Sequence, residues 1–293
     1  MSLDAELGER KEVRTPEWRL AYYDRGEGEP IVFLHGLVAN PLIWRKVVPD
    51  LAGSYRCIVP ELPLGSHQIP MPRDADLSPP GLAALVNAFL EQLDLREVTL
   101  VGNDTGGAIA QLVAARHPDR IGRLVLTPSD AFDHFPPPQF RILMVMGWTP
   151  GLPWLTVQQM RIERMRYLPF AYGKLVKRRM PREITDAYLQ PLHRAAIRRD
   201  LTKVIRNIRK RYLQEAAMRL REFDKPVLLV WPPDDPVFLF EYAKRLAELM
   251  PNAKIAEVED SWGFVSEDRP DVLVREIGTF MRAIQTKAHE PTA

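Results

Sequence analysis

A short glycine-rich motif around Asp104 carries the clearest chemistry in this sequence. A strand-like apolar run at residues 98–101 leads into Gly-Asn-Asp-Thr-Gly-Gly at residues 102–107, and a helical pattern follows at once. Such a sharp strand-to-helix turn needs small flanking residues, so that the central residue can adopt a strained backbone conformation and present its side chain at the helix N-terminus. Aspartate is also an ordinary helix N-cap, but a cap alone does not require three glycines around it. We therefore predict that Asp104 is a presented carboxylate, able to act as a nucleophile or as a proton acceptor.

A second motif, His-Gly-Leu-Val at residues 35–38, follows another apolar run. Together the two motifs resemble the α/β-hydrolase superfamily, in which backbone N–H groups after the His-Gly pair and after the nucleophile form an oxyanion hole. The resemblance implies oxyanion donors at Leu37 or Val38 and at Thr105, and a structural role for His35. An aspartate nucleophile is similar to the branch that contains haloalkane dehalogenases, fluoroacetate dehalogenases and soluble epoxide hydrolases. In that branch the carboxylate attacks an sp³ carbon, and a histidine-activated water hydrolyses the resulting alkyl ester.

The resemblance also implies an acidic residue that orients the histidine. The strand-like run at residues 227–231 leads to Pro-Pro-Asp-Asp-Pro, where Asp235 is the better match to that acid and Asp234 is the second. The two prolines stiffen this loop but leave the carboxylate in place. An alternative acid is Asp130, which follows the run at residues 124–127 at a location that some dehalogenases use.

The histidine itself is missing. After the run at residues 255–258 the chain reads Glu-Asp-Ser-Trp-Gly-Phe-Val at residues 259–265, and Gly263 stands where the family usually has its histidine. Three explanations stay open. His134, just beyond the loop that contains Asp130, could act as a substitute base. Alternatively, the ester persists or a ligand is bound without turnover, as in a pseudo-hydrolase, or Asp104 is the proton acceptor in general-base or lyase chemistry.

The residues that mark particular substrates differ from those of the related families. Thr105 stands where haloalkane dehalogenases typically have a halide-binding tryptophan, and Leu37 stands where many have an asparagine. Four tyrosines within residues 134–219 permit epoxide opening without indicating it. Apolar side chains suited to a substrate pocket are Trp44, Phe132, Phe135, Met144, Trp148 and Trp262. We predict a hydrolase-type enzyme for a small, largely apolar haloalkane, epoxide or ester, in which hydrolysis of the covalent intermediate is impaired or altered.

The elements that position these residues follow from hydrophobic periodicity. Residues 18–23 alternate apolar and polar side chains, as in a strand with one buried face. Short apolar runs typical of buried strands lie at residues 31–34, 56–60, 98–101, 124–127, 227–231 and 255–258. Helical periodicity at residues 82–93 and 108–116 separates several of them. This alternation predicts an α/β protein with a mostly parallel sheet and helices on both faces, and the resemblance specifies the α/β-hydrolase fold.

The alternation stops at three consecutive prolines, residues 136–138. A helical pattern then runs to about residue 220, which predicts a helical cap at residues 134–219 and an α/β core at residues 1–133 and 220–293. The cap holds 18 Lys and Arg against 5 Asp and Glu, whereas the rest of the chain holds 22 against 33. This charge predicts a solvated helical layer, or attraction of an anionic substrate, nucleic acid or membrane surface. Because no nucleic-acid motif is present, a small-molecule substrate is the expected partner.

The composition of the chain limits the remaining classes of protein. The 293 residues are 46% hydrophobic, which suffices for a large core and excludes global disorder. One cysteine, Cys57, and no Cys/His cluster argue against a disulfide scaffold and a structural zinc site, and no metal or organic cofactor is implied. No run resembles a signal peptide or a transmembrane segment, which favours a cytoplasmic location. The expected oligomeric state is a monomer or a homodimer. The ends, residues 1–10 and 286–293, are expected to be frayed.

Overall fold

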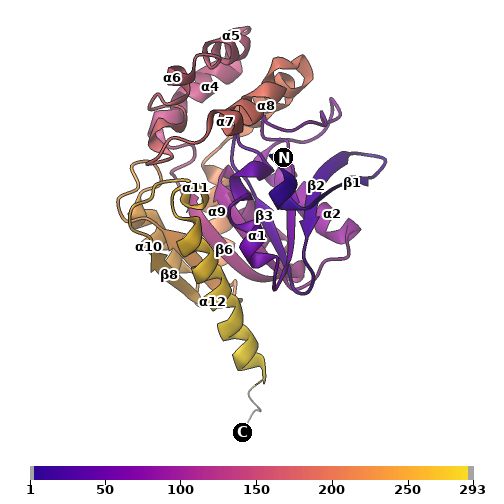
Figure 1. Ribbon diagram of the computed structural model, residues 1–293, viewed down its shortest axis with the longest axis vertical. Coiled ribbons are helices and arrows are strands. Elements are labelled where there is room, and N and C mark those ends of the chain that lie inside the picture. Colours follow the sequence, from indigo (N-terminus) through magenta and orange to yellow (C-terminus); the bar gives the residue numbers. More distant parts are fainter. Residues whose placement is uncertain (1–2, 290–293) are drawn as a thin grey trace.

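Eight strands form one mixed sheet in the computed structural model, which describes residues 3–289. The strand order is β1-β2-β4-β3-β5-β6-β7-β8, in which β2 pairs antiparallel with both neighbours and all other pairs are parallel. Helices lie on both faces of the sheet (Figure 1). This architecture confirms the predicted α/β fold with a mostly parallel sheet. The strands are β1 (Glu9–Arg14), β2 (Arg19–Arg25), β3 (Pro30–Leu34), β4 (Arg56–Pro60), β5 (Val98–Asp104), β6 (Ile121–Ser129), β7 (Val227–Trp231) and β8 (Ala253–Glu257).

The central strands are buried on both faces, as their continuous apolar sequences predict. Every residue of β5 and of β7 is buried. Because parallel strands end at the same edge of a sheet, the loops that follow β3, β5, β6 and β7 come together at the carboxyl edge. Each of these loops carries one of the residues that the sequence singled out, so the sheet itself assembles the candidate site.

The N-terminal segment differs from the expected frayed end. Leu7 is fully buried in the core, and β1 pairs with β2 from Glu9 opposite Asp24 to Arg14 opposite Arg19. The charged sequence of β1 hides the strand, because an edge strand exposes most of its side chains to solvent. At the other end, α12 (Pro270–His289) continues into the segment that was expected to fray, and residues 290–293 lie outside the described part of the chain.

Two groups of helices pack on the sheet. In the first, α3 (Thr105–Arg116) contacts both α2 (Pro79–Gln92) and α9 (Arg211–Leu220), and α3 packs on β5 and β6. In the second, α1 (Val48–Leu51) contacts α12, which packs on β7. A further helix, α10 (Phe240–Leu249), packs on β7 and β8. Across residues 3–289, no helix is long and apolar enough to cross a lipid bilayer.

All the helices between β6 and β7 come from the predicted insertion. Figure 1 shows α4 to α8 gathered at one end of the molecule. The last helix of the insertion, α9, instead packs beside the sheet against α3. The division into a core and a cap of residues 134–219 remains a prediction. The helices at the end of the molecule are α4 (Arg141–Trp148), α5 (Leu152–Gln159), α6 (Glu163–Arg166), α7 (Arg182–Leu189) and α8 (Ala195–Asn207).

Candidate active site

Asp104 lies at the sharp turn between β5 and α3, with a positive φ of 53°. This conformation is strained for an aspartate, and close packing around the turn maintains it. A Cβ atom on Gly36 would lie 2.5 Å from the Cβ of Asp104, and one on Gly106 would lie 2.5 Å from the carbonyl oxygen of His35. These short distances explain why both motifs contain glycine. The close approach of the two backbones places the Asp104 side chain at the carboxyl edge of the sheet.

The carboxylate of Asp104 is almost enclosed by protein. Its Oδ1 accepts hydrogen bonds from the backbone N–H of Thr105 (2.5 Å) and from the Thr105 hydroxyl (3.1 Å). Burial raises the pKa of Asp104 to about 7, and the two hydrogen bonds oppose this rise. Asp104 therefore ionises near neutral pH. Its ionised form is a poorly solvated carboxylate, which is the form that can attack carbon.

A second carboxyl group, that of Asp130, lines the same cavity as Asp104. Gln111 of α3 fixes this loop by donating from Nε2 to the carbonyl oxygen of Asp130 (2.7 Å). The Oδ1 atom of Asp130 is buried and has no hydrogen-bond partner among the described residues. Burial, and next the charge of Asp104, raise the pKa of Asp130 well above its usual range. When the pair carries one negative charge, the charge lies on Asp104 and Asp130 keeps its proton.

The two predicted N–H donors after Gly36 differ in availability. The N–H of Val38 donates to the carbonyl oxygen of Leu64 (2.9 Å), so Val38 is not available as an oxyanion donor. The N–H of Leu37 makes no hydrogen bond within residues 3–289 and is free for a ligand. The N–H of Thr105 is engaged by Asp104. Leu37 is therefore the backbone donor that this loop offers to a ligand oxygen.

His35 makes hydrogen bonds to the backbone through both ring nitrogens. Its Nε2 accepts from the N–H of Leu62 (2.9 Å), which leaves the proton on Nδ1 to be donated to the carbonyl oxygen of Gly36 (3.0 Å). Burial lowers the pKa of His35 to about 4. His35 is therefore neutral and holds the loop in place, which agrees with its expected structural role.

The two acids predicted after β7 lie in different environments. Asp234 is exposed to solvent, whereas Asp235 is buried. The Oδ1 of Asp235 accepts hydrogen bonds from the N–H groups of Val237 and Phe238, both at 2.8 Å. Its Oδ2 is buried without a hydrogen-bond partner in the described chain, and burial raises the pKa of Asp235 to about 7. The geometry thus favours Asp235 over Asp234, and one of its oxygens lacks the partner that a histidine would supply.

Replacing Asp235 by Asn is expected to change how stability depends on pH. Because the native pKa of Asp235, about 7, lies above the unfolded value of about 3.9, folding favours the protonated form and stability falls as the pH rises between these values. The ionisation cost over this range is about 4 kcal/mol. In urea denaturation, the free energy of unfolding of Asp235→Asn should fall less from about pH 4 to about pH 8 than that of the wild type. The exposed control Asp234→Asn should follow the wild type, and equal pH dependence of both variants would contradict the prediction.

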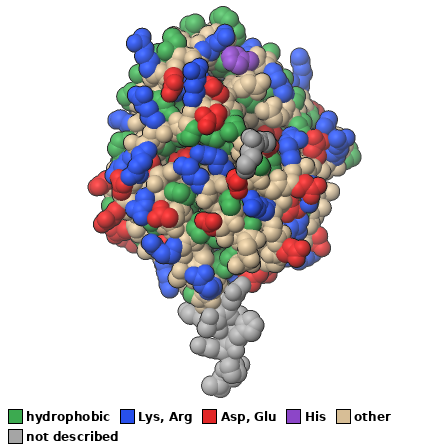
Figure 2. All heavy atoms as spheres, in the orientation of Figure 1, with side chains coloured by type: hydrophobic (Ala, Val, Ile, Leu, Met, Phe, Trp, Pro, Cys, Tyr) green, Lys and Arg blue, Asp and Glu red, His purple; other side chains and the backbone are tan. Residues whose placement is uncertain are grey.

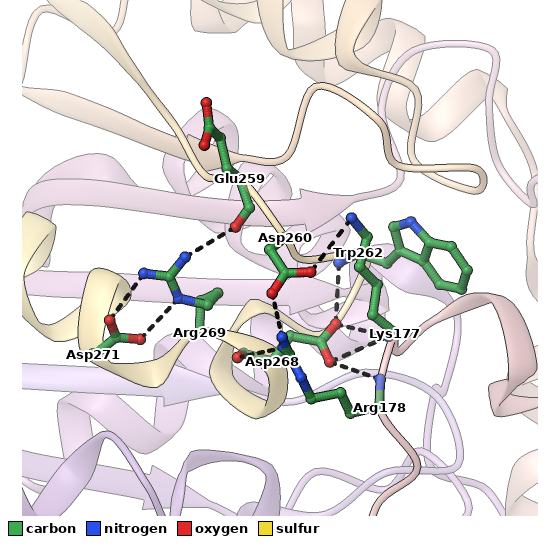
Figure 3. A network of polar contacts seen from close by, with 8 residues as sticks. All are labelled: Lys177, Arg178, Glu259, Asp260, Trp262, Asp268, Arg269 and Asp271. Carbon is green, nitrogen blue, oxygen red and sulfur yellow. Dashed lines mark hydrogen bonds and ion pairs between the residues drawn. The ribbon is translucent and has the colours of Figure 1, made fainter.

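Gly263 lies in a loop between β8 and α11 (Val265–Asp268) that polar contacts hold in place (Figure 3). The carbonyl oxygen of Gly263 accepts a hydrogen bond from Nδ2 of Asn103, the residue before Asp104 (2.7 Å). This bond ties the loop to the end of β5. The carboxylate of Asp268 accepts hydrogen bonds from the backbone N–H groups of Trp262, Lys177 and Arg178.

A histidine at position 263 would require its neighbours to move. A Cβ atom there would lie 3.1 Å from Cδ2 of Leu175 and 3.3 Å from Cε2 of Phe238. Leu175 also lines the cavity, and its carbonyl oxygen accepts a hydrogen bond from the N–H of Phe264 (2.8 Å). Leu175 therefore occupies space beside Gly263 that an imidazole would need. The sequence does not reveal Leu175, because it is an ordinary apolar residue in a distant part of the chain.

The structure does not bring His134 to the cavity. Its Nε2 lies 2.8 Å from the carbonyl oxygen of Val237, and its ring packs against that of Tyr242. No histidine is among the described residues that line the cavity with Asp104. The prediction of His134 as a substitute base is therefore not supported by its position, because a hydrogen bond to the backbone turns the ring toward Val237.

An apolar cavity with a volume of about 120 Å³ lies beside Asp104 and Asp130. Of the six pocket residues predicted from the sequence, Phe135 and Met144 line it. Tyr172 also lines it, and its hydroxyl donates to the carbonyl oxygen of Val38 (2.7 Å). The cavity suits an apolar ligand, because most of the other lining side chains are apolar, among them Leu37, Leu143, Met160, Phe170, Leu189 and Ile205.

The other four predicted pocket residues lie elsewhere. Trp44 is fully buried in the core, and Phe132 stacks on an aromatic ring of α10. Trp148 is 59% exposed on the outer surface of α4, and Trp262 lies beside Lys177 (Figure 3). The prediction of these four as pocket residues is wrong, because core packing and surface exposure use the same apolar residue types as a pocket does.

Known proteins resemble this chain over most of its length. A family model described as the alpha/beta hydrolase fold matches residues 29–161. A cis-3-alkyl-4-alkyloxetan-2-one decarboxylase of Shewanella oneidensis is 29% identical over 92% of this chain and 87% of its own. A haloalkane dehalogenase of Mesorhizobium japonicum is 27% identical over 93% of this chain and 91% of its own.

Solved structures share the fold as well. The structure of a haloalkane dehalogenase from Bradyrhizobium elkani matches with a TM-score of 0.79 at 21% identity, covering 95% of this chain and 99% of that one. The family model, the relatives that match over most of the chain, the strand order and the strained turn at Asp104 all indicate the same fold. This chain has the α/β-hydrolase fold.

Proposed function

We propose that this protein is an enzyme that uses Asp104 as a nucleophile against a small, apolar electrophile. The observation that carries the proposal is a buried carboxylate, held at a strained turn, that faces an apolar cavity. In the reaction, one carboxylate oxygen attacks an sp³ carbon as the bond from that carbon to the leaving group breaks. The leaving group takes the electron pair, and an alkyl ester of Asp104 forms.

The residues around Asp104 favour an oxygen leaving group over a halide. Thr105 and Leu37 stand where a tryptophan and an asparagine would be expected for halide binding, and neither side chain carries an N–H donor. Asp130 keeps its proton when Asp104 is ionised, so it can protonate an alkoxide that leaves from an opened epoxide. The free N–H of Leu37 can bind the same oxygen. Strained oxygen rings are therefore the preferred substrate class, followed by haloalkanes and esters.

The fate of the ester depends on the substrate, because no histidine lies among the described cavity residues to activate water. The ester formed from an epoxide or a haloalkane is expected to persist. A four-membered lactone can instead proceed without water. Attack of Asp104 on the sp³ ring carbon that is bonded to the ring oxygen breaks that carbon–oxygen bond, which opens the ring and frees a carboxylate. Loss of CO₂ then supplies the electron pair for an alkene, and the bond to Asp104 breaks, which regenerates the carboxylate.

This elimination route is our second candidate function, and the relatives favour it. Two full-length relatives, from Shewanella oneidensis and Xanthomonas campestris, are named as cis-3-alkyl-4-alkyloxetan-2-one decarboxylases, and an oxetan-2-one is a four-membered lactone. The route requires the nucleophile and the apolar cavity but no base for hydrolysis. It therefore accounts for a site that keeps Asp104 and places Leu175 beside Gly263.

Intact-protein mass spectrometry with a bromoalkane, an alkyl epoxide and a cis-3,4-dialkyl-oxetan-2-one tests both candidates. We expect a lasting mass increase with the first two compounds, mapped to Asp104 by peptide analysis. With the lactone we expect alkene and CO₂ without a lasting adduct. If no compound gives an adduct or a product while the protein still binds them in thermal-shift assays, the enzyme proposal fails and a ligand-binding pseudo-hydrolase takes its place.

The rate of adduct formation is expected to rise with pH through about 7. Only ionised Asp104 can attack, and burial raises the pKa of this carboxyl to about 7, so protonation removes the nucleophile below that pH. An aspartate of ordinary pKa would give a flat profile above about pH 5. The initial rate of the mass increase with a bromoalkane, whose leaving group needs no proton, measures the profile. A flat profile from about pH 5 to about pH 8 would contradict the assignment.

A further inference from the structure

The outer surface of α4 and α5 exposes large apolar side chains. Trp148 is 59% exposed and Trp154 is 52% exposed. Ile142, Val145 and Trp148 follow at three-residue spacing and so lie along one side of α4, which contacts α5. Single exposed apolar residues are common, but a cluster of this kind marks an interaction site. We name as the cap surface the exposed residues Ile142, Val145, Trp148, Trp154, Leu155, Ile162 and Phe170.

Positive charge surrounds the cap surface. Within residues 138–171 three arginines are exposed, Arg141, Arg161 and Arg164, and the segment contains a single acid, Glu163. Arg206 of α8 lies with its guanidinium 5.0 Å from the centre of the Trp148 ring. Figure 2 shows hydrophobic side chains interspersed with Lys and Arg at the end of the molecule where Figure 1 labels α4 to α6. Exposed tryptophans among basic residues are typical of proteins that lie in the interface of anionic membranes.

The inner sides of the same helices line the cavity. Met144 of α4 and Val157 of α5 contribute to its wall, while other side chains of both helices are exposed to solvent. Phe170 belongs to both surfaces, since it lines the cavity and is 41% exposed. Phe170 therefore joins the cap surface to the wall of the cavity that Asp104 lines.

We propose that the cap surface docks on an anionic lipid bilayer, with Trp148 and Trp154 in the interfacial region and the arginines against the headgroups. A second copy of the chain fits this surface less well, because two basic surfaces repel each other. A nucleic acid fits less well, because binding of phosphates alone leaves the apolar side chains in water. Docking would place the cavity next to a source of apolar substrate.

Cosedimentation of the full chain with lipid vesicles tests this proposal. We expect at least about tenfold stronger binding to vesicles of equal phosphatidylglycerol and phosphatidylcholine than to phosphatidylcholine alone. Trp148→Gln with Trp154→Gln should lower this binding at least about tenfold. The control Met218→Gln, which removes a 64% exposed apolar side chain on α9, should bind as the wild type does. Arg161→Gln with Arg164→Gln should weaken binding to the anionic vesicles only.

Two results would overturn the proposal. One is equal vesicle binding by the wild type and the double tryptophan variant, or no binding by either. The other is a wild-type protein that forms a dimer and binds no vesicles, while the double tryptophan variant is a monomer. That result would identify a second copy of the chain as the occupant of the cap surface. Thermal unfolding checks that the variants fold. Adduct formation with a water-soluble bromoalkane, measured without vesicles, reports failure of the Asp104 chemistry separately.

Discussion

Asp104→Asn is expected to abolish formation of the alkyl adduct. A neutral amide oxygen is a much weaker nucleophile than a carboxylate, so the rate should fall by at least about 10³-fold. Asparagine retains an acceptor for the N–H of Thr105 and tolerates the positive φ of position 104, so the turn should be preserved. The measurement is the increase in intact protein mass with time, at one concentration of bromoalkane or epoxide for all variants.

Asp130→Asn is the matched control for this prediction. Asp130 lines the same cavity and is equally enclosed, but it is assigned to proton donation rather than attack. The variant should still form the adduct from a bromoalkane, because bromide leaves without a proton. With an epoxide it should react more slowly, because the alkoxide no longer receives the proton of Asp130. An adduct on Asp104→Asn at the wild-type rate, or mapping of the wild-type adduct to Asp130, would assign the nucleophile to Asp130 instead.

The features predicted correctly are those that depend on local sequence. The turn at Asp104 is encoded by glycines within a few residues, each of which allows a backbone approach that a Cβ would block. The central strands are encoded by continuous apolar runs that are buried on both faces. The strand β1 escaped prediction, because its charged residues follow from its place at the sheet edge and not from a buried pattern.

The features that the sequence could not predict depend on distant parts of the chain. The sequence does not distinguish the N–H groups of Leu37 and Val38 as oxyanion donors. Only the N–H of Val38 is occupied, because it donates to the carbonyl oxygen of Leu64. His134 lies close to the site in sequence, but Val237 and Tyr242 hold its ring elsewhere. The carboxyl groups of Asp104 and Asp130 come close together only when β5 and β6 pair, and their repulsion decides which of them keeps a proton.

Gly263→His combined with Leu175→Ala is expected to convert a lasting adduct into turnover. The histidine would stand beside Phe238, whose N–H donates to Oδ1 of Asp235. The Oδ2 of Asp235 is buried and has no hydrogen-bond partner among the described residues, so it can accept the imidazole N–H. Leu175→Ala removes the side chain that lies 3.1 Å from the new Cβ. A positioned general base accelerates hydrolysis by about 10²- to 10⁴-fold. The adduct from a bromoalkane should therefore decay to the free protein with release of the alcohol, followed by mass spectrometry in ¹⁸O-labelled water.

The matched control is Gly263→Gln with Leu175→Ala, which adds comparable bulk without a base and should retain the adduct. Gly263→His alone should gain less, because Leu175 still occupies the space of the imidazole. Conversion of a dialkyl-oxetan-2-one to alkene should change little in the histidine variant, because elimination uses no activated water. An adduct that persists in the histidine double variant as long as in the wild type would show that more than a base is missing. Faster alkene formation in that variant would instead place a base in the elimination route and contradict the two-step mechanism proposed for Asp104.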